Sequence, residues 1–321
     1  MRVIVVTRHG GPEVLEVQDR PAPEPGPGEL LVDIEAIGVN YRDVYEREGG
    51  GTHAADTPHL AGVEGAGRVS AVGEGAGGFA PGDRVAWSNA PGSYAEQVLV
   101  DADAAVALPE GISTEVAAAA MLQGSTAHYL ATSTYPIQRG DTVLVHAAAG
   151  GVGLLLTQIA KRRGGRVIAT TSTEEKAELA RGAGADETIG YDGFGERARE
   201  LTGGEGVHAV YDGIGAATFD ESLSALRPRG YMVLYGAASG PPPPVEIARL
   251  NAASLFLTRP TLTHYGREGD ELRMRAGELL EWIAAGELDV RIGGRYPLAD
   301  AARAQADLES RATTGKLILT P

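Results

Sequence analysis

Short apolar stretches rich in β-branched residues, broken by glycine, proline and aspartate, make up the first third of the chain. They include RVIVVTR at residues 2–8, LLVDIEAIGV at 30–39 and SYAEQVLV at 93–100. Runs of this length and character are typical of strands. The proline-rich PAPEPGPGE at 21–29 cannot be helical and separates the first two. The pattern predicts an all-β domain folded as a closed or partly closed barrel.

From about residue 113 the pattern changes to helices and strands in alternation. An alanine-rich segment at 113–134 predicts a helix, and strand-like and helix-like segments alternate from there to about residue 260. The strands are expected in DTVLVHA, RVIATT, ADETIGY, VHAVYDG, YMVLYGA and the end of PPPPVEIARLNAASLFLTRP, which also holds a helix. Another helix is expected over TFDESLSALRPRG. This α/β alternation predicts a doubly wound parallel sheet with right-handed crossovers.

The tail departs from this alternation. It contains an amphipathic helix in ELRMRAGELLEWIAAGEL, a second helix near 299–309 and a final strand in GKLILTP. We expect the tail to return to the first domain. The predicted domains are therefore 1–123 with 260–321, and 124–259.

The loop LVHAAAGGVG joins a predicted strand to a predicted helix. Ala148, Gly150 and Gly153 occupy the three positions of the dinucleotide fingerprint G-x-G-x-x-G, with alanine in place of the first glycine. Gly150 would let a pyrophosphate approach the backbone, and Gly153 would allow close helix packing. The start of the helix would direct free N–H groups at the anion. The strand–loop–helix context favours a nicotinamide cofactor over a structural turn.

The end of the next strand distinguishes NADP from NAD. NAD sites usually carry Asp or Glu there, whereas this strand ends in Thr170, Thr171 and Ser172. Ser172 is expected to cap the following helix in a capping box with Glu175, and Lys176 follows in the first turn. A hydroxyl, free amides and a lysine suit a 2′-phosphate, so the segment favours NADPH, with a capped surface helix as the alternative.

Composition and charge narrow the class of partner. The net charge of −15 disfavours nucleic acid and anionic lipid, so an anionic cofactor needs local positive groups. The absence of cysteine excludes disulfides, thiolate ligands and a catalytic thiol, and suits a reducing compartment. The sequence has no long apolar run and does not begin like a secretion signal, so we expect a cytoplasmic protein.

The histidines do not have the spacing of zinc ligands. None of the seven falls in an H-x₃₋₅-H or H-E-x-x-H pattern. His53 and His59 share a glycine-rich segment, a spacing more typical of a solvated loop than of a zinc pair. No bound metal is expected.

Motifs along the whole chain resemble the quinone oxidoreductase branch of the medium-chain dehydrogenase/reductases. They are AIGVNYRDVY, GDRV, HAAAGGVG, YDGIG, RPRGYMVLYGAASG and ESRATTGKLIL. The resemblance implies a GroES-like β-barrel domain with both termini, an inserted Rossmann domain, NADPH in the cleft and a homodimer joined through the Rossmann edge strand. Zinc-bearing relatives have cysteine at the position of Asn40, a His-Glu pair at Val63 and Glu64, and cysteine near Leu122 and Gln123. Only the glutamate is present here, which indicates the zinc-free branch.

The resemblance also implies contacts with the cofactor in both domains. They are Asn40, Asp43 and Val44 beside the nicotinamide, Thr126 and His128 at the cleft, Gly150, Gly151 and Val152 at the pyrophosphate, Ser172 and Lys176 at the 2′-phosphate, Tyr191 at the adenine end, Gly213, Tyr235, Gly236, Ala237 and Ala238 after two later strands, and the cations Arg259 and Lys316. Relatives commonly have tyrosine at the position of His128. Asn40 as a turn residue, Tyr191 as a strand end and Lys316 as a solvated flank are the structural alternatives.

Reduction of a quinone needs few catalytic side chains, because NADPH supplies the hydride. The protein must hold the acceptor in place and exclude water. Asn40 and Tyr45 are the candidate donors to the quinone oxygens, with Tyr45 equally suited to form an aromatic wall. The alternatives are an NADPH-dependent enone or enoyl reductase and a non-catalytic structural or RNA-binding protein. Together the residues and the resemblance predict a zinc-independent NADPH:quinone reductase.

Overall fold

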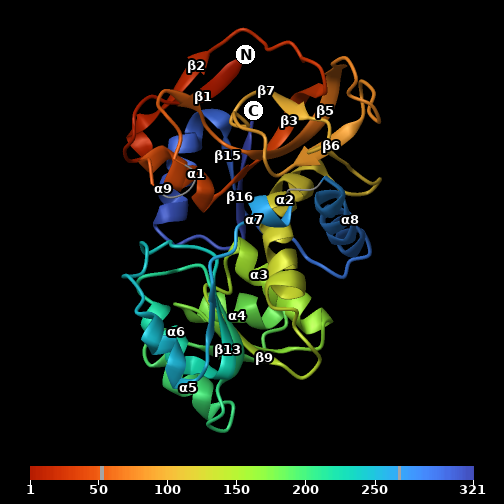
Figure 1. Ribbon diagram of the computed structural model, residues 1–321. Helices are drawn as coiled ribbons and strands as arrows, with labels where there is room; N and C mark the ends of the chain where they lie inside the picture. The colour runs from red at the N-terminus through yellow and green to blue at the C-terminus, as the bar shows by residue number, and fades with distance from the viewer. Residues whose placement is uncertain (51–53, 267–268) are drawn as a thin grey trace. The chain divides into compact units, whose positions relative to one another are not determined.

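The computed structural model describes residues 1–50, 54–266 and 269–321, which form two compact units (Figure 1). Unit 1 comprises Met1–Gln123 and Glu268–Pro321, and unit 2 comprises Gly124–Arg267. Both ends of the chain therefore belong to unit 1, and the sequence of unit 2 is inserted into it.

Unit 1 contains a seven-stranded, mainly antiparallel sheet. Its order is β15-β16-β3-β5-β6-β8, with β7 also paired to β3. The strands are β3 (Glu29–Val39), β5 (Glu64–Val72), β6 (Arg84–Trp87), β7 (Gln97–Asp101), β8 (Val106–Ala107), β15 (Ile292–Pro297) and β16 (Lys316–Thr320). In the β16–β3 pair, Ile318 lies opposite Gly38. The last strand of the chain is thereby placed beside β3, the strand that leads into α1 (Tyr41–Glu48).

A smaller sheet completes the β structure of unit 1. Its order is β2-β1-β4, and it consists of β1 (Arg2–Val6), β2 (Leu15–Asp19) and β4 (His59–Leu60). A bridge between Val3 and Ala95 connects β1 to the segment before β7. Apolar residues of both sheets share one core, in which Trp87 and Tyr94 are fully buried. The strands predicted in the first third are confirmed, but this part of the chain also contains a helix, Tyr41–Glu48, so it is not all-β.

Unit 1 also contains helices. They are α1 (Tyr41–Glu48), α8 (Gly269–Ala284), α9 (Ala301–Glu309), the first part of α2 (Thr114–Tyr129) and the 3₁₀ turns Pro12–Val14 and Leu298–Asp300. The hydrophobic pattern did not predict α1. Local chemistry forms it, because Asn40 and Asp43 make a capping box and Gly49 ends it at φ 71°.

Unit 2 is built on a six-stranded parallel sheet. Its order is β11-β10-β9-β12-β13-β14, the 3-2-1-4-5-6 arrangement of a Rossmann fold. The strands are β9 (Thr142–Val145), β10 (Arg166–Thr170), β11 (Glu187–Ile189), β12 (Val207–Asp212), β13 (Leu226–Leu234) and β14 (Phe256–Thr258). The predicted doubly wound sheet is confirmed.

Helices accompany the strands of unit 2. They are α3 (Gly151–Arg162), α4 (Glu174–Gly182), α5 (Phe194–Glu200), α6 (Phe219–Ala225) and α7 (Leu262–Tyr265), with a π turn at Leu130–Thr134 and a 3₁₀ helix at Ile247–Ala252. α3 contacts β9 and β10, and α4 contacts β10 and β11. α5 packs against α6, which in turn contacts β12 and β13 (Figure 1).

Two predicted helices in unit 2 were partly wrong. The helix expected over TFDESLSALRPRG ends at Ala225, and β13 begins at the next residue. Pro228 lacks an N–H group and its ring clashes with the preceding helical turn, so the helix cannot continue through it. The helix expected before β14 is a 3₁₀ helix over Ile247–Ala252.

Candidate functional site

The loop after β9 is shaped by close approaches of its own backbone. Ala147 has φ 48°, and its carbonyl oxygen accepts a hydrogen bond from Gly150 N at 2.8 Å. A Cβ atom at Gly153 would lie 2.4 Å from the same oxygen, so only glycine fits there. The positive φ belongs to Ala147 and not to Ala148, which explains why alanine is tolerated at the first fingerprint position.

The first turn of α3 follows this loop directly. Gly150 is the N-cap, and no side chain of the described residues caps the helix. Gly150, Gly151 and Val152 are partly exposed. The free N–H groups and the positive end of the helix dipole can therefore receive an anion.

A fully buried histidine precedes the loop and joins three segments of unit 2. His146 Nδ1 lies 2.8 Å from Thr170 Oγ1, and Nε2 lies 2.9 Å from Ser222 Oγ. Ser222 donates its only proton to Thr218 O at 2.7 Å, so it accepts from Nε2–H. Nδ1 therefore accepts the proton of Thr170. Burial lowers the pKa of His146 to about 4, which keeps the ring neutral at pH 7.

The residues after β10 form a polar surface around the start of α4. Ser172 and Thr173 are exposed, and Lys176 Nζ donates to Ser172 Oγ at 3.4 Å. The predicted capping box between Ser172 and Glu175 is wrong by one residue. Thr173 is the N-cap, because it has the extended backbone of a cap and its Oγ1 accepts from Lys176 N at 3.3 Å.

Tyr191 belongs to the same surroundings. Its hydroxyl accepts a hydrogen bond from Ala147 N at 3.1 Å, and its ring stacks on His146 with 6.1 Å between centroids. The structure thus brings Tyr191 to the loop after β9.

The carboxyl ends of β12 and β13 are also linked. Asp212 Oδ1 accepts hydrogen bonds from Ile214 N at 2.7 Å and Gly215 N at 3.0 Å. Its carbonyl accepts from Tyr235 N at 2.8 Å. These bonds gather the predicted residues Gly213, Tyr235, Gly236, Ala237 and Ala238, of which Ala238 donates its N–H to Gly213 O at 3.2 Å.

Three further predicted residues of unit 2 lie on other elements. Arg259 follows β14 and donates from Nη1 to Leu234 O at 3.0 Å. Thr126 and His128 are buried in α2. Thr132 Oγ1, in the π turn that follows α2, donates to His128 O at 2.8 Å.

In unit 1, a buried ion pair connects three distant parts of the chain. Lys316 Nζ lies 2.5 Å from Glu64 Oε2 and 2.7 Å from Asn40 Oδ1, and Lys316 and Glu64 are 1% and 0% exposed. Asn40 Nδ2 donates to Glu64 Oε2 at 2.9 Å and to Gly38 O at 3.3 Å. Leu122 N donates to Glu64 Oε1 at 2.6 Å. Glu64 is therefore bonded on both oxygens.

A second buried carboxyl lies beside this cluster. Asp43 Oδ2 accepts hydrogen bonds from Asn40 N at 2.9 Å and from the Tyr94 hydroxyl at 2.8 Å. Burial and, to a smaller extent, the nearby Glu46 raise the pKa of Asp43 to about 7. Val44, the next residue, is also buried.

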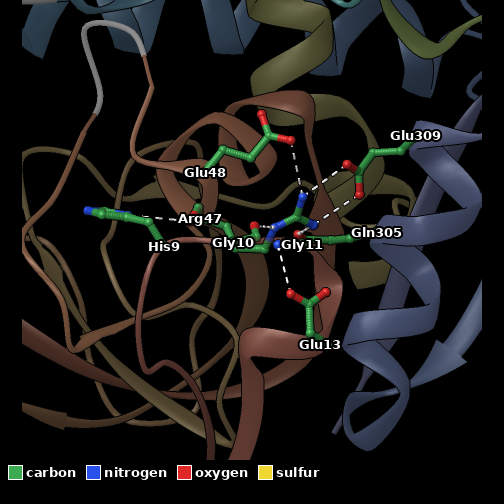
Figure 2. A network of polar contacts seen from close by, with 8 residues as sticks. All are labelled: His9, Gly10, Gly11, Glu13, Arg47, Glu48, Gln305 and Glu309. Atoms are coloured by element: carbon green, nitrogen blue, oxygen red, sulfur yellow. Dashed lines mark hydrogen bonds and ion pairs between the residues drawn. The ribbon is translucent and has the colours of Figure 1, made fainter.

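The far end of α1 is anchored by a buried arginine (Figure 2). Arg47 is 0% exposed and pairs with both carboxylate oxygens of Glu309, at 3.0 and 2.9 Å. It also donates to Gln305 Oε1 at 2.8 Å and to Gly10 O at 2.9 Å. These contacts hold α1 against α9 and the segment before β2, and so help to position Asn40 and Asp43 at the start of the helix and Tyr45 within it.

The structure thus brings together some of the predicted site residues within each unit. In unit 1 these are Asn40, Asp43 and Lys316. In unit 2 they are Tyr191 with the loop after β9, Ser172 with Lys176, and Gly213 with Tyr235 to Ala238. Thr126, His128 and Arg259 lie on other elements of unit 2. The residues that sequence reasoning missed are the ones that hold these groups in place: Arg47, Tyr94, His146, Asp212, Thr218 and Ser222. Only His146 had a usable signal, since it stands between a buried strand and the fingerprint loop. His53 lies outside the described residues, and His59 Nδ1 lies 3.2 Å from Asp56 O.

Comparison with known proteins gives family matches in both predicted domains. Residues 26–110 match the model of the alcohol dehydrogenase GroES-like domain, and residues 151–285 match that of the zinc-binding dehydrogenase. The quinone oxidoreductase of Pseudomonas aeruginosa is 45% identical over 98% of this chain and 97% of that protein. The Escherichia coli quinone oxidoreductase, solved with NADPH, is 41% identical and covers both chains completely with a TM-score of 0.97.

The chain belongs to the medium-chain dehydrogenase/reductases, in the quinone oxidoreductase branch.

Other members of this family extend the comparison. A mycobacterial protein, solved with NADPH, is 52% identical and covers both chains completely with a TM-score of 0.97. The 2-haloacrylate reductase of Burkholderia is 38% identical over 99% of this chain and 98% of that protein. This medium-chain reductase is thus an oxidoreductase by family, with relatives named for different acceptors.

The residues at the positions of the zinc ligands do not suit zinc. Asn40, Glu64 and Leu122 do lie together, but Asn40 is a neutral amide and the Glu64 carboxylate is neutralised by Lys316. A lysine ammonium and a zinc ion would compete for the same oxygen. Within residues 1–50, 54–266 and 269–321, no three His, Asp or Glu side chains gather as metal ligands. The helices of these residues also lack the length and apolar character needed to cross a membrane.

The Lys316–Glu64 pair makes a prediction about stability. Lys316→Met leaves a buried carboxylate without its cation and is expected to lower the free energy of unfolding by about 3–5 kcal/mol. Adding Glu64→Gln removes the unpaired charge, so the double variant loses less than Lys316→Met alone. Chemical denaturation followed by tryptophan fluorescence measures this, because Trp87 and Trp282 both belong to unit 1.

Arg295→Met is the matched control. Arg295 pairs with Glu115 at 2.7 Å in the same unit, but the two side chains are 54% and 37% exposed. Exposed pairs contribute little, so its loss should be much smaller. Equal losses for Lys316→Met and Arg295→Met would contradict the importance of the buried pair.

Proposed function

We propose that this protein is a zinc-independent, NADPH-dependent quinone reductase. The balanced reaction takes NADPH, a proton and a quinone to NADP⁺ and a hydroquinone. The observation that carries the proposal is the end of β10, where Ser172 and Lys176 meet at 3.4 Å and none of the three residues directly after the strand is a carboxylate. A quinone acceptor is supported by full-length similarity to quinone oxidoreductases.

In unit 2, the predicted residues would bind different parts of the cofactor. Gly150, Gly151 and Val152 would meet the pyrophosphate at the start of α3, where the first N–H groups of the helix would point at the anion. Ser172 and Lys176 would bind the 2′-phosphate by charge-assisted hydrogen bonds. Tyr191 would lie at the adenine end. The remaining contacts would come from Thr126, His128, Gly213, Tyr235, Gly236, Ala237, Ala238 and Arg259.

In unit 1, Tyr45 is the stronger candidate for a hydrogen-bond donor to the quinone. Both protons of the Asn40 amide are donated within the unit, to Glu64 and Gly38. Asn40 would therefore contribute to the nicotinamide site indirectly, by holding Lys316 and the start of α1 in place. Asp43 and Val44 would border the same region.

An enone or acrylate reductase is the second candidate. It needs the same fold and cofactor, and the 38% identity to a 2-haloacrylate reductase supports it. Such an enzyme would deliver the hydride to the carbon–carbon double bond of an electron-poor alkene.

We also propose a cytoplasmic homodimer joined through β14. This strand is at the edge of the parallel sheet, and Phe256 is 49% exposed on it while stacking on Tyr231 with 4.4 Å between ring centroids. An apolar edge strand readily pairs with a second copy of itself. The lack of cysteine suits a reducing compartment.

The cofactor assignment predicts a selective effect of Lys176→Ala. The binding free energy of NADPH should weaken by on the order of 2 kcal/mol, because a charge-assisted contact is lost, and its dissociation constant should rise accordingly. The dissociation constant for NADH should change little. Calorimetric titration of both cofactors measures this. Lys161→Ala is the control, since Lys161 pairs with Asp186 at 2.8 Å elsewhere in unit 2. Equal effects on both cofactors would remove Lys176 from the phosphate site.

A panel of acceptors tests the reaction. NADPH oxidation should be fastest with ortho- or para-quinones and should persist after treatment with a zinc chelator. Enones, haloacrylates and enoyl thioesters run under the same conditions are the comparison. If any of these is reduced far faster than every quinone, the second candidate is correct, and if chelation abolishes activity, the zinc-independent assignment is wrong.

The dimer is tested by a charge on the edge strand. Sedimentation should give a dimer for the wild type and a monomer for Phe256→Glu, because a charge at the edge opposes pairing of two copies. Val17→Glu, at a 48% exposed residue of β2 in unit 1, should remain dimeric. A wild-type monomer, or a dimer in Phe256→Glu, would exclude this interface.

A further inference from the structure

Two short segments of unit 2 must act together on one cofactor if the proposed function holds. The loop after β9 would bind the pyrophosphate, and the start of α4 would bind the 2′-phosphate. The adenosine part of NADPH joins these two groups at a limited distance. The affinity gained at the second phosphate therefore depends on how rigidly the two protein segments are spaced.

Thr170 is the residue that links the segments. It is the last residue of β10 and is 0% exposed, and two residues later Ser172 is exposed. Its carbonyl oxygen accepts a hydrogen bond from Ala148 N at 3.2 Å, and its hydroxyl donates to His146 Nδ1 at 2.8 Å. One hydrogen bond alone would leave the loop free to turn about it, whereas two bonds from one residue also set the orientation.

The imidazole is itself held in place. Ser222 accepts from Nε2–H at 2.9 Å on the far side of the ring, and the ring of Phe194 meets it edge-on with 4.7 Å between centroids. On the other side of Thr170, Thr171 N donates to Ile189 O at 3.0 Å and ties the chain to β11. The Thr170–His146 bond therefore joins two parts that are each already fixed.

From this arrangement we infer that the Thr170–His146 hydrogen bond is a positioning device for cofactor selection. It sets the spacing between the pyrophosphate loop and the 2′-phosphate segment, and so favours NADPH over NADH. NADH has no 2′-phosphate and needs only the first segment, so it is insensitive to this spacing. The inference rests on the proposed use of both segments for NADPH.

Thr170→Val tests it by removing the hydroxyl while keeping the shape of the side chain. The ratio of the dissociation constant for NADH to that for NADPH should fall about tenfold, because the second phosphate loses effective concentration at its site. Thr170→Ser restores a hydroxyl and should restore the ratio. Calorimetric titration of both cofactors gives the readout, and an unchanged ratio in Thr170→Val overturns the inference.

Ser222→Ala is the matched control. It removes the other hydrogen bond of the same imidazole and leaves the Thr170 bond intact. The melting temperature should fall, but the NADH-to-NADPH ratio should stay at the wild-type value. A fall in the ratio as large as that in Thr170→Val would mean that general loosening, and not the spacing, controls selection.

Two substitutions of His146 provide a second route if Thr170→Val does not fold. In His146→Asn the amide oxygen takes the place of Nδ1 and keeps the Thr170 bond, whereas in His146→Gln the amide reaches Ser222 and loses Thr170. The ratio should be retained in the first and lowered in the second. The opposite order, or equal ratios, overturns the inference.

These results separate the inference from the proposed function. A wild-type protein that binds NADH as tightly as NADPH contradicts the proposed function itself. A wild-type preference that Lys176→Ala reduces and Thr170→Val leaves intact contradicts only the role of the Thr170–His146 bond.

Discussion

The parallel pairing of β9 with β10 and β12 is the constraint on which the site of unit 2 depends. In a parallel sheet, every strand ends at the same edge, so the residues that follow separate strands meet there. Thr170 ends β10, Asp212 ends β12 and His146 directly follows β9, so all three lie at this edge of the sheet. Thr170 O accepts a hydrogen bond from Ala148 N in the loop after β9, and Asp212 O accepts one from Tyr235 N after β13, so these two strand ends hold the loop that follows a neighbouring strand. His146 bonds to the end of β10 itself, through Thr170.

Unit 1 depends on a different constraint, because charged side chains are buried in its apolar interior and must be stabilised there. Lys316 and Glu64 are both buried, and a buried charge is costly unless it is paired and fully hydrogen-bonded. Asn40 and Leu122 N complete the bonding of the glutamate, and Arg47 is satisfied in the same way at the other end of α1. Zinc-bearing relatives place a metal cation among these positions, whereas here an ammonium group supplies the positive charge.

Much of the fold could be predicted because it depends on local patterns. The alternation of strands and helices after residue 113 indicates the parallel sheet, and β-branched runs indicate the sheets of unit 1. The errors occurred where a long-range contact or a backbone conformation decides. The helix over TFDESLSALRPRG ends at Ala225 because Pro228 cannot lie inside a helix and residues from Leu226 onward pair in β13. The cap of α4 is Thr173 because its backbone is extended.

By itself, the sequence determined the family and the parallel sheet, since these depend on short motifs and on periodicity, and it predicted where a cofactor's phosphates bind. Only the tertiary structure decided which side chains support those motifs. His146 and Ser222 are 76 residues apart, and Lys316 and Glu64 are 252 residues apart. Hydrogen bonds over such separations follow from the packing of whole strands and helices, and no local pattern records them.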